Sequence, residues 1–239
     1  MSDTNRPDTR IAGAGTVTGG TYGEVMIAGS GTVSGDMDCT TFKVGGVADV
    51  QGTLTAQTIS VGGSANFTGD VKGGEVVFSG NADVHGAFTA ETLKVSGVAR
   101  FDGSVSAERV EIKGTTKIGG GCQAESFDAQ GAFSVGGLLN AGTVSIRLYG
   151  GCDAHDIGGE TIDVRLATPW VFLPFLGERN LTADSIEGDT IYLENTRAKV
   201  VRGANVTIGA DCAIDLVEYS GTMTGSAGVV SSRKVEPKL

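Results

Sequence analysis

The sequence predicts an all-β protein folded as a β-solenoid, in which short strands wind into stacked coils, and three observations support this prediction. An apolar pattern recurs at every seventeenth position between residues 33 and 146 without slippage, as in proteins built from stacked repeats. Within each repeat, apolar and polar residues alternate with the period of two that is typical of strands. Glycine is frequent (39 of 239 residues) and proline is rare (4), so bends are available between short strands.

The repeat defines columns of like residues, which we number from the apolar residue of each Val-x-Gly element as position 0. Position 0 is occupied by Val33, Val50, Phe67, Val84, Phe101, Ile118 and Val135, and Cys152 continues the series. Positions 4, 9 and 11 are also apolar, position 6 is small, and glycine recurs at positions 2 and 13. Coils stacked about 4.8 Å apart would pair their backbone groups with the coils above and below. We therefore expect about 17 residues and three short strands per coil; a β-sandwich and a propeller, the main alternatives, use longer strands.

Followed in order, the chain divides into five predicted segments. They are 1–10, a disordered N-terminal tail; 11–165, a regular β-helix; 166–180, an aromatic strap or insertion; 181–220, further β-helix coils; and 221–239, a flexible C-terminal tail that is rich in Gly and Ser and then charged.

Two irregularities are expected within the coils. The first coil is one residue short, and after Ile146 the coil marked by Ile157 and Ile162 is displaced by one residue. Beyond the aromatic segment, we expect the pattern to resume with Leu181, Ala183 and Ile186 at positions 4, 6 and 9.

The aromatic segment holds the only Trp of the chain and two of its nine Phe. It is too short and too interrupted by proline to span a membrane. Two interpretations stay open. The segment is either a strap or cap that packs across the solenoid, or an apolar contact surface for a partner or a membrane face. The candidates for such a contact are Trp170, Phe172, Leu173, Phe175 and Leu176.

Composition disfavours several classes of protein. The net charge of −10 argues against nucleic acid as a partner. The N-terminus, MSDTNRPDTR, lacks the apolar core of a signal peptide, and no stretch reaches the roughly 20 apolar residues of a spanning helix. We expect a cytoplasmic protein, with the inner face of the cell membrane as an alternative location. Cys39, Cys122 and Cys152 fall on inward positions, where a free thiol packs as a small apolar group.

The outward positions show no catalytic or ligand-binding pattern. The two histidines, His85 and His155, have no Ser or Cys nucleophile expected on the same face. No cysteine pair has metal-binding spacing, and the Gly-x-Gly pairs follow the coil period rather than a nucleotide motif. Glu91, Glu108 and Glu125 form an acidic column that could attract a divalent cation, although a solvated face is the favoured interpretation. We therefore predict no enzyme activity, no catalytic or metal-binding residues and no cofactor.

The ends of the solenoid are the remaining candidate site. An end coil presents unpaired N–H and C=O groups and an open section of core, which must be capped or stacked against another molecule. End contacts that do not close on themselves produce filaments. The candidate residues for such a polymer interface are Ile11, Val17, Val25 and Ile27 in the first coil and Ile208, Ile214 and Val217 in the last.

Phrases such as DGSVSAERVEIKGTTKIGG (102–120) resemble the bactofilins, which are bacterial polymer-forming cytoskeletal proteins. Roughly residues 11–160, and less clearly 181–220, share the pattern Gly-x-Val/Ile-x-Gly followed by Val-x-Ala-Glu-x-Val-x-Ile. The resemblance implies a right-handed parallel β-helix with a triangular hydrophobic core. It also implies assembly through the ends, without nucleotide, into non-polar filaments that scaffold cell-envelope, cell-shape or motility machinery.

The implied partners are further copies of the chain, together with membrane-associated or envelope proteins, and neither nucleic acid nor nucleotide. The chain departs from typical members, which have a shorter single core and Pro-rich tails. The main alternative is a non-polymerising β-helix binding module that recruits a partner or membrane through residues 170–176. A β-helix enzyme that uses His85 or His155 is less favoured.

Overall fold

The structure is a computed structural model and describes residues 6–167, 179–225 and 228–235. It divides into two compact units, Met1–Gly120 and Gly121–Leu239. All secondary-structure elements among the described residues are β-strands, and each unit is a parallel β-solenoid. The prediction of an all-β solenoid is confirmed.

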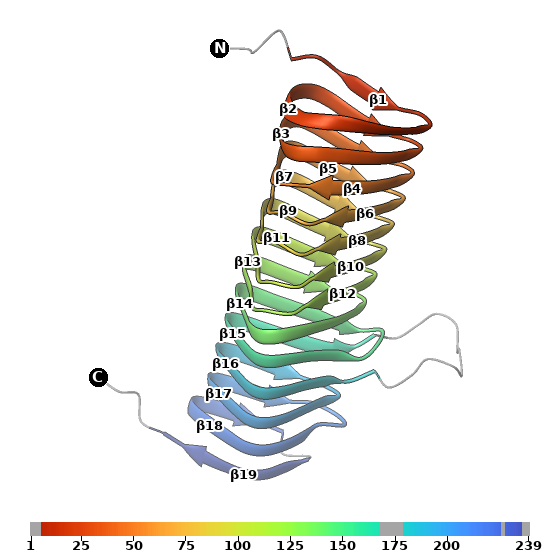
Figure 1. Ribbon diagram of the computed structural model, residues 1–239. Coiled ribbons are helices and arrows are strands. Elements are labelled where there is room, and N and C mark those ends of the chain that lie inside the picture. Colours follow the sequence, from red (N-terminus) through yellow and green to blue (C-terminus); the bar gives the residue numbers. More distant parts are fainter. Residues whose placement is uncertain (1–5, 168–178, 226–227, 236–239) are drawn as a thin grey trace. The chain divides into compact units, whose positions relative to one another are not determined.

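The first unit contains the strands that follow one another around its successive coils (Figure 1). They are β1 (Thr9–Ile11), β2 (Ala14–Ile27), β3 (Ser30–Val44), β4 (Val47–Gln51), β5 (Leu54–Val61), β6 (Ser64–Phe67), β7 (Val71–Phe78), β8 (Asn81–Val84), β9 (Phe88–Val95), β10 (Val98–Phe101), β11 (Val105–Ile112) and β12 (Thr115–Ile118).

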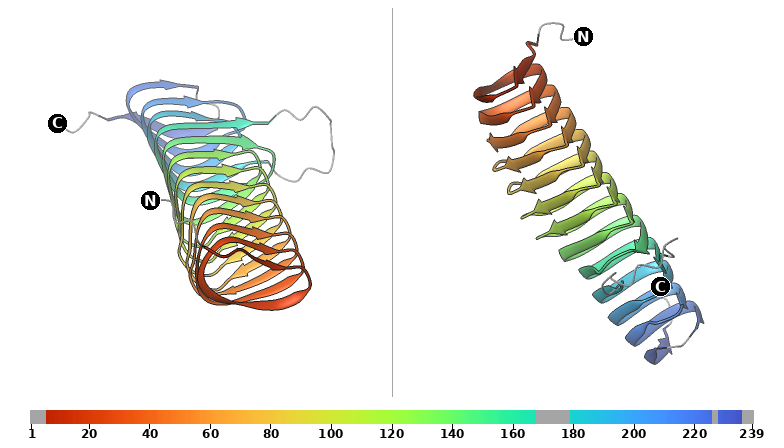
Figure 2. Two further views of the ribbon diagram at one scale, coloured as in Figure 1. Left: turned by 90° about the horizontal axis from the view of Figure 1, so that it is seen from above. Right: turned by 90° about the vertical axis from the view of Figure 1, so that its right-hand side faces the viewer.

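The expected length of the regular coil is also confirmed. Partners on neighbouring coils lie 17 residues apart, as do Asp49 and Asn66, which face each other across β4 and β6. The same spacing joins Leu54 to Val71 and Val71 to Phe88. Figure 2 shows the coils of the first unit stacked one upon another.

Each regular coil has three short faces, although it contains only two continuous strands. The ladder between β5 and its neighbours omits Gln57, and the alternation of buried and outward residues also breaks there. The eight-residue strand is therefore bent into 54–56 and 58–61, and β6 supplies the third face. This bend places positions 4 and 6 on one face and positions 9 and 11 on the next.

The inside of the first unit is filled by ladders of apolar side chains. Phe42, Phe67, Phe78, Phe88 and Phe101 are almost fully buried, and the rings of Phe88 and Phe101 meet edge to face with centroids 4.9 Å apart. Burying one such side chain stabilises the fold by about 1.5–3 kcal/mol. Parallel stacking repeats this contribution in every coil.

The glycines at position 13 are required by close stacking. A Cβ on Gly63 would lie 2.0 Å from the carbonyl oxygen of Gly46, and a Cβ on Gly80 would lie 1.9 Å from that of Gly63. The left-handed conformation is found instead at Gly35 and Gly52, at position 2. Further along the position-2 column, at Gly69 and Gly86, glycine is again required by close approach, because a Cβ would lie 2.3 and 2.4 Å from backbone atoms of the neighbouring coil.

The second unit uses longer strands and less regular coils. Its strands are β13 (Cys122–Ala129), β14 (Ala132–Leu148), β15 (Cys152–Leu166), β16 (Leu181–Leu193), β17 (Thr196–Ile208), β18 (Ala213–Thr224) and β19 (Val229–Lys234). Along the position-4 column the partners are Cys122, Leu139, Ile157, Ile186, Val201, Val217 and Ser232.

The spacing along this column is irregular. The step from Cys122 to Leu139 equals the regular period, and the step from Leu139 to Ile157 is one residue longer, so the predicted displacement at Ile157 is confirmed. The lengths of the later coils can be taken from side-chain contacts next to this column. Asp156 and Ser185 are 29 residues apart in the sequence, Arg202 and Glu218 are 16 apart, and Glu218 and Arg233 are 15 apart.

Two sequence assignments in this unit are wrong. Cys152 pairs with Phe133, not with the position-0 residue Val135, which pairs with Ala154. Leu181 pairs with Cys152, Ala183 with Ala154 and Ile186 with Ile157, so these three residues occupy positions −2, 0 and 4 instead of 4, 6 and 9. Cys152 is displaced because the corner after position 11 contains residues 147–151, whereas the corresponding regular corner contains only 45–47. Ala183 and Ile186 are displaced because the corner after position 0 has three intervening residues in β14 and only two in β15 and β16.

At both chain ends, strands extend into segments for which the sequence predicts tails. Residues Thr9–Ile11 of the predicted N-terminal tail and first coil pair with Val25–Ile27. In the predicted C-terminal tail, β18 continues to Thr224 and β19 adds a further rung on β18. The β19 rung escapes prediction because its residues VVSSRK are largely polar and exposed.

Candidate assembly surfaces

The N-terminal end of the first unit is a step, by which we mean that its outermost strand covers only part of the coil next to it. β1 covers only the Val25–Ile27 part of β2, and Figure 1 shows it lying over one side of the first coil. Pro7 extends this step, because its carbonyl oxygen accepts a hydrogen bond from the Gly23 amide at 3.0 Å. No described strand lies over residues 14–22 of β2, so their outward backbone edge is open.

Tyr22 partly covers this open end. It pairs with Cys39 in the position-6 column, which otherwise holds small residues such as Ala56 and Gly73. Its ring lies beside Gly20, and its hydroxyl donates a hydrogen bond to the Thr18 carbonyl oxygen at 3.0 Å. Tyr22 is the outermost described residue of this column in the first unit.

The C-terminal end of the second unit is also a step. β19 pairs with Ile214–Tyr219 of β18, and the Val235 amide donates to the Tyr219 carbonyl oxygen at 2.8 Å. No strand of the described chain lies over Thr222–Thr224. Among the described residues, this face of the last complete coil therefore has no strand stacked on it.

A buried carboxylate fixes the last rung. The Glu218 side chain is 10% exposed and pairs with Arg202 at 2.6 Å and with Arg233 of β19. These charged hydrogen bonds, with that from Arg202 the stronger influence, hold the pKa of Glu218 below its usual value. The ion pairs connect three successive rungs of this end.

The structure places the predicted interface residues at different depths. Ile11 and Val17 are the outermost and keep 8% and 9% exposure, whereas Val25 and Ile27 are fully buried beneath β1. At the other end, Ile214 and Val217 lie beneath β19, and Ile208 lies in the preceding coil. The role of all seven in assembly stays a prediction.

The aromatic contact candidates, Trp170 to Leu176, lie outside the described residues. The described flanks show how the chain leaves and re-enters the coil. Arg179 donates a hydrogen bond to the Ala167 carbonyl oxygen at 2.9 Å, and Glu194 accepts one from the Leu166 amide at 2.9 Å. The ladder resumes at once with Leu181 on Cys152. The described residues on either side of 168–178 are thus held to each other and to the neighbouring coils.

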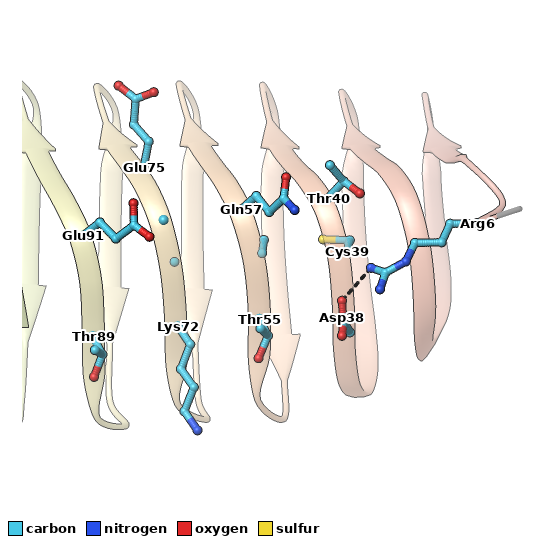
Figure 3. Close-up of a pocket in the computed structure, with 13 residues that line it drawn as sticks. Arg6, Asp38, Cys39, Thr40, Thr55, Gln57, Lys72, Glu75, Thr89 and Glu91 are labelled. Atoms are coloured by element: carbon cyan, nitrogen blue, oxygen red, sulfur yellow. Dashed lines mark hydrogen bonds and ion pairs between the residues drawn. The ribbon is translucent and has the colours of Figure 1, made fainter. Parts of the chain in front are cut away.

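Each unit carries a shallow groove along its position-6 corner. In the first unit it measures about 1010 Å³ and is lined by residues such as Cys39, Thr55, Gln57, Lys72 and Glu91 (Figure 3). The wall is concave there because position 6 is small. The grooves hold scattered polar side chains, and in the first an ion pair of 2.7 Å joins Arg6 to Asp38 at one end.

His85 belongs to a hydrogen-bonded chain on the outer wall. Its Nδ1 lies 2.5 Å from Asp102 and its Nε2 lies 2.9 Å from the Asn66 side-chain oxygen. Asn66 donates in turn to Asp49 at 2.9 Å. Both partners are side chains from neighbouring coils, one a carboxylate and one an amide, so these contacts tie the coils together.

His155 lies in a cluster that the sequence analysis missed. Its Nδ1 lies 2.8 Å from Asp156, whose other oxygen accepts a hydrogen bond from the Ser185 hydroxyl. The Asp156 hydrogen bond raises the pKa of His155. Ser185 donates to the carboxylate and not to the imidazole, so the serine lacks a general base of the catalytic-triad kind. Ser185 follows Asp156 by 29 residues because the insertion lies between them, so the regular period of 17 does not predict their contact.

The remaining reactive groups are packed away. All four cysteines are free and buried, and burial raises the pKa of Cys39 and Cys122 to about 12. Among the described residues there is no group of His, Cys, Asp and Glu side chains arranged to hold a metal ion. The same residues contain no helix long and apolar enough to cross a membrane.

The fold and its surfaces thus define a parallel β-solenoid whose distinctive features are open ladder edges. Residues 65–140 match the family model of the bactofilins, described as polymer-forming cytoskeletal proteins. The chain is 56% identical over 229 residues to the uncharacterized protein YhbE of Bacillus subtilis (strain 168), covering 94% of this chain and 97% of that one. It is 45% identical over 83 residues to the uncharacterized protein YhbF of the same organism, which is 34% of each chain. No solved structure matches. The chain belongs to the bactofilin family.

Proposed function

We propose that this protein assembles end to end, without nucleotide, into filaments that act as a cytoplasmic scaffold for cell-envelope, cell-shape or motility machinery. The observation that carries the proposal is the pair of open ladder edges, over residues 14–22 and over Thr222–Thr224. Unpaired backbone groups beside apolar core favour the addition of another strand. The polymer-forming character of the family supports the same function.

Sedimentation of the purified full chain, in buffer without ATP or GTP, tests this proposal. The wild-type chain is expected to pellet and to show filaments by negative-stain electron microscopy. Val17→Glu places a charge in the outermost core position and should reduce the pelleted fraction at least tenfold. Thr18→Glu, which changes the adjacent exposed residue of the same strand, is the matched control and should pellet like the wild type. A wild-type chain that stays monomeric at high concentration would contradict the proposal.

A second candidate function is a binding module that recruits a partner or membrane through residues 170–176. It is favoured by the hydrogen bond from Arg179 to the Ala167 carbonyl oxygen, which joins the two described flanks of this segment. A chain in which a Gly/Ser linker replaces 168–178 should then fold and pellet normally but lose binding to phosphatidylethanolamine–phosphatidylglycerol vesicles. Equal vesicle binding by both chains would dismiss the membrane form of this candidate.

A further inference from the structure

We propose that β19 is an autoinhibitory cap, which blocks the C-terminal end of the solenoid while it lies on β18 and exposes a self-association surface when it is released. This inference rests on the proposed end-to-end assembly and adds a control at one of the two ends. Three observations support it. They are the polar side chains that β19 places over the core, the apolar residues beneath them, and the exposed contacts that hold the strand in place.

β19 places polar side chains over the core columns. Ser232 stacks on Val217 at position 4 and Lys234 stacks on Tyr219 at position 6, and both β19 side chains are exposed. A further coil stacked on β19 would bury this hydroxyl and this ammonium group, which is strongly unfavourable for an unpaired charge. Stacked coils meet around their whole circuit, so a polar rung over positions 4 and 6 blocks the joint, as terminal capping repeats do in other solenoids.

Release of β19 would uncover an apolar surface. Ile214 and Val217 are 1% and 0% exposed, and the strand that covers them on this side is β19. Without it, both side chains and the ladder edge of Ile214–Tyr219 would face the solvent, where another copy could bury them. The cap and a second copy therefore compete for one surface, and assembly at this end draws on the fraction of chains whose cap is released.

The side-chain contacts that hold β19 are polar and lie near the surface. The Ser231 hydroxyl donates a hydrogen bond to the Asp215 carbonyl oxygen at 3.0 Å, and Arg233 Nε donates to the Glu218 carboxylate at 2.7 Å. The Arg233 side chain is 65% exposed, so water competes for this ion pair. Among the described strands, β19 pairs only with β18. It can therefore leave without breaking the ladder between the strands beneath it.

A reversible disulfide tests the cap in the full chain. Leu216 and Ser231 are paired neighbours on β18 and β19. Neighbouring strands lie about 4.8 Å apart, within the Cα separation of about 4.4–6.8 Å that a disulfide spans. The oxidised double variant, Leu216→Cys with Ser231→Cys, should not pellet and should give no species larger than a dimer by light scattering, because only the N-terminal end stays available. The same chain reduced with dithiothreitol should pellet at least as readily as the wild type.

A second variant loosens the cap without changing the coil beneath it. Arg233→Gln removes the ion pair with Glu218, so it should raise the fraction of released β19 and lower the critical concentration for pelleting by about threefold. Lys113→Gln removes the same charge from an exposed residue of the first unit and is the matched control, which should pellet like the wild type. Circular dichroism checks that each variant folds.

The outcomes separate this proposal from the previous one. Equal pelleting of the oxidised and reduced double variant, or an Arg233→Gln chain that pellets no more readily than the Lys113→Gln chain, overturns the cap and leaves end-to-end assembly intact. Failure of the disulfide to form contradicts the pairing of β19 with β18 and also overturns the cap. Absence of polymer from the wild type, from Arg233→Gln and from the reduced double variant overturns end-to-end assembly and the cap with it.

Discussion

The two units make the corner after position 11 in different ways. In the first unit, the position-13 glycines, such as Gly63, bring successive coils so close that a Cβ has no room, although a Cβ on the preceding Gly62 would meet nothing closer than 3.8 Å. In the second unit, the corner is widened by Arg147 and Leu148 in β14 and later closed by Asn195 and Asp211 with positive φ, residue types that tolerate this conformation. The comparison teaches that the solenoid depends on its inward columns and accepts more than one corner.

The coil lengths lead to the same conclusion. The first unit keeps one period from Val25 onward, while the spacing of partners in the second varies from 15 to 29. Ile162, Ile191 and Val206 nevertheless stack in one buried column. Length differences are absorbed where the chain turns, and the core between the turns is unchanged.

The largest expected effect breaks the tight corner. Gly63→Ala would bring a Cβ to 2.0 Å from the Gly46 oxygen, so the coils must separate, and we expect a loss of about 3 kcal/mol in the free energy of unfolding. Gly150→Ala, where the nearest atom is the Ala132 Cβ at 3.3 Å, should cost less than about 1 kcal/mol. Urea unfolding of both variants measures the difference. Equal losses would mean that the corners are equally restrictive.

A smaller effect concerns a flaw in the regular unit. Thr116 is 1% exposed, and its hydroxyl has no hydrogen-bond partner within the described part of the chain. Because a buried unpaired hydroxyl is costly, Thr116→Val should raise the free energy of unfolding by about 1–2 kcal/mol. The same change at the exposed Thr115 serves as control. A lower midpoint in urea for Thr116→Val would show that the hydroxyl has a partner.

The smallest effect is local to the irregular unit. The pKa of Glu218 is held below its usual value by Arg202 and Arg233, so its contribution is complete above the unfolded pKa and is lost as pH falls through the folded one. Hydrogen exchange of the β19 amides should therefore accelerate at acid pH.

The Glu218→Gln variant should show that faster exchange already near neutral pH, with little change in β15 or β16. Glu160→Gln, at an exposed carboxyl, is the matched control and should exchange like the wild type. If the β19 amides exchange equally fast in all three chains across the pH range, the ion pairs do not hold the last rung.

The fold could be predicted in detail wherever the sequence repeats. The register of Leu54, Val71 and Phe88 follows from their spacing, because each coil sees nearly the same neighbours. The alignment of Ala183 and Ile186 could not be predicted, because two corners of changed length precede them. The apolar pattern alone is compatible with more than one assignment of these residues to the columns. The regular period therefore predicts structure only as far as it persists.

The candidate surfaces were predictable in kind but not in shape. An open end is implied by any solenoid, and Ile11 and Val17 follow from their phase. The steps depend on where β1 and β19 stop. β19 could not be predicted because it has Ser232 at the apolar position 4 and Lys234 at the small position 6. The Ser185–Asp156–His155 cluster was not predicted either, because Ser185 and Asp156 are separated by the insertion and contact each other only in the folded chain.

The parallel register has a mechanical consequence. Each coil is joined to the next by backbone hydrogen bonds on all three faces, and these bonds run along the stacking direction. A pulling force along that direction is shared by all the hydrogen bonds between two coils. The coils therefore separate only when all of these bonds break at the same time. A pull on a free edge such as β19 loads its bonds one after another. Within a unit, resistance to tension is therefore set by the weakest coil boundary, and resistance to unwinding by the outermost strand.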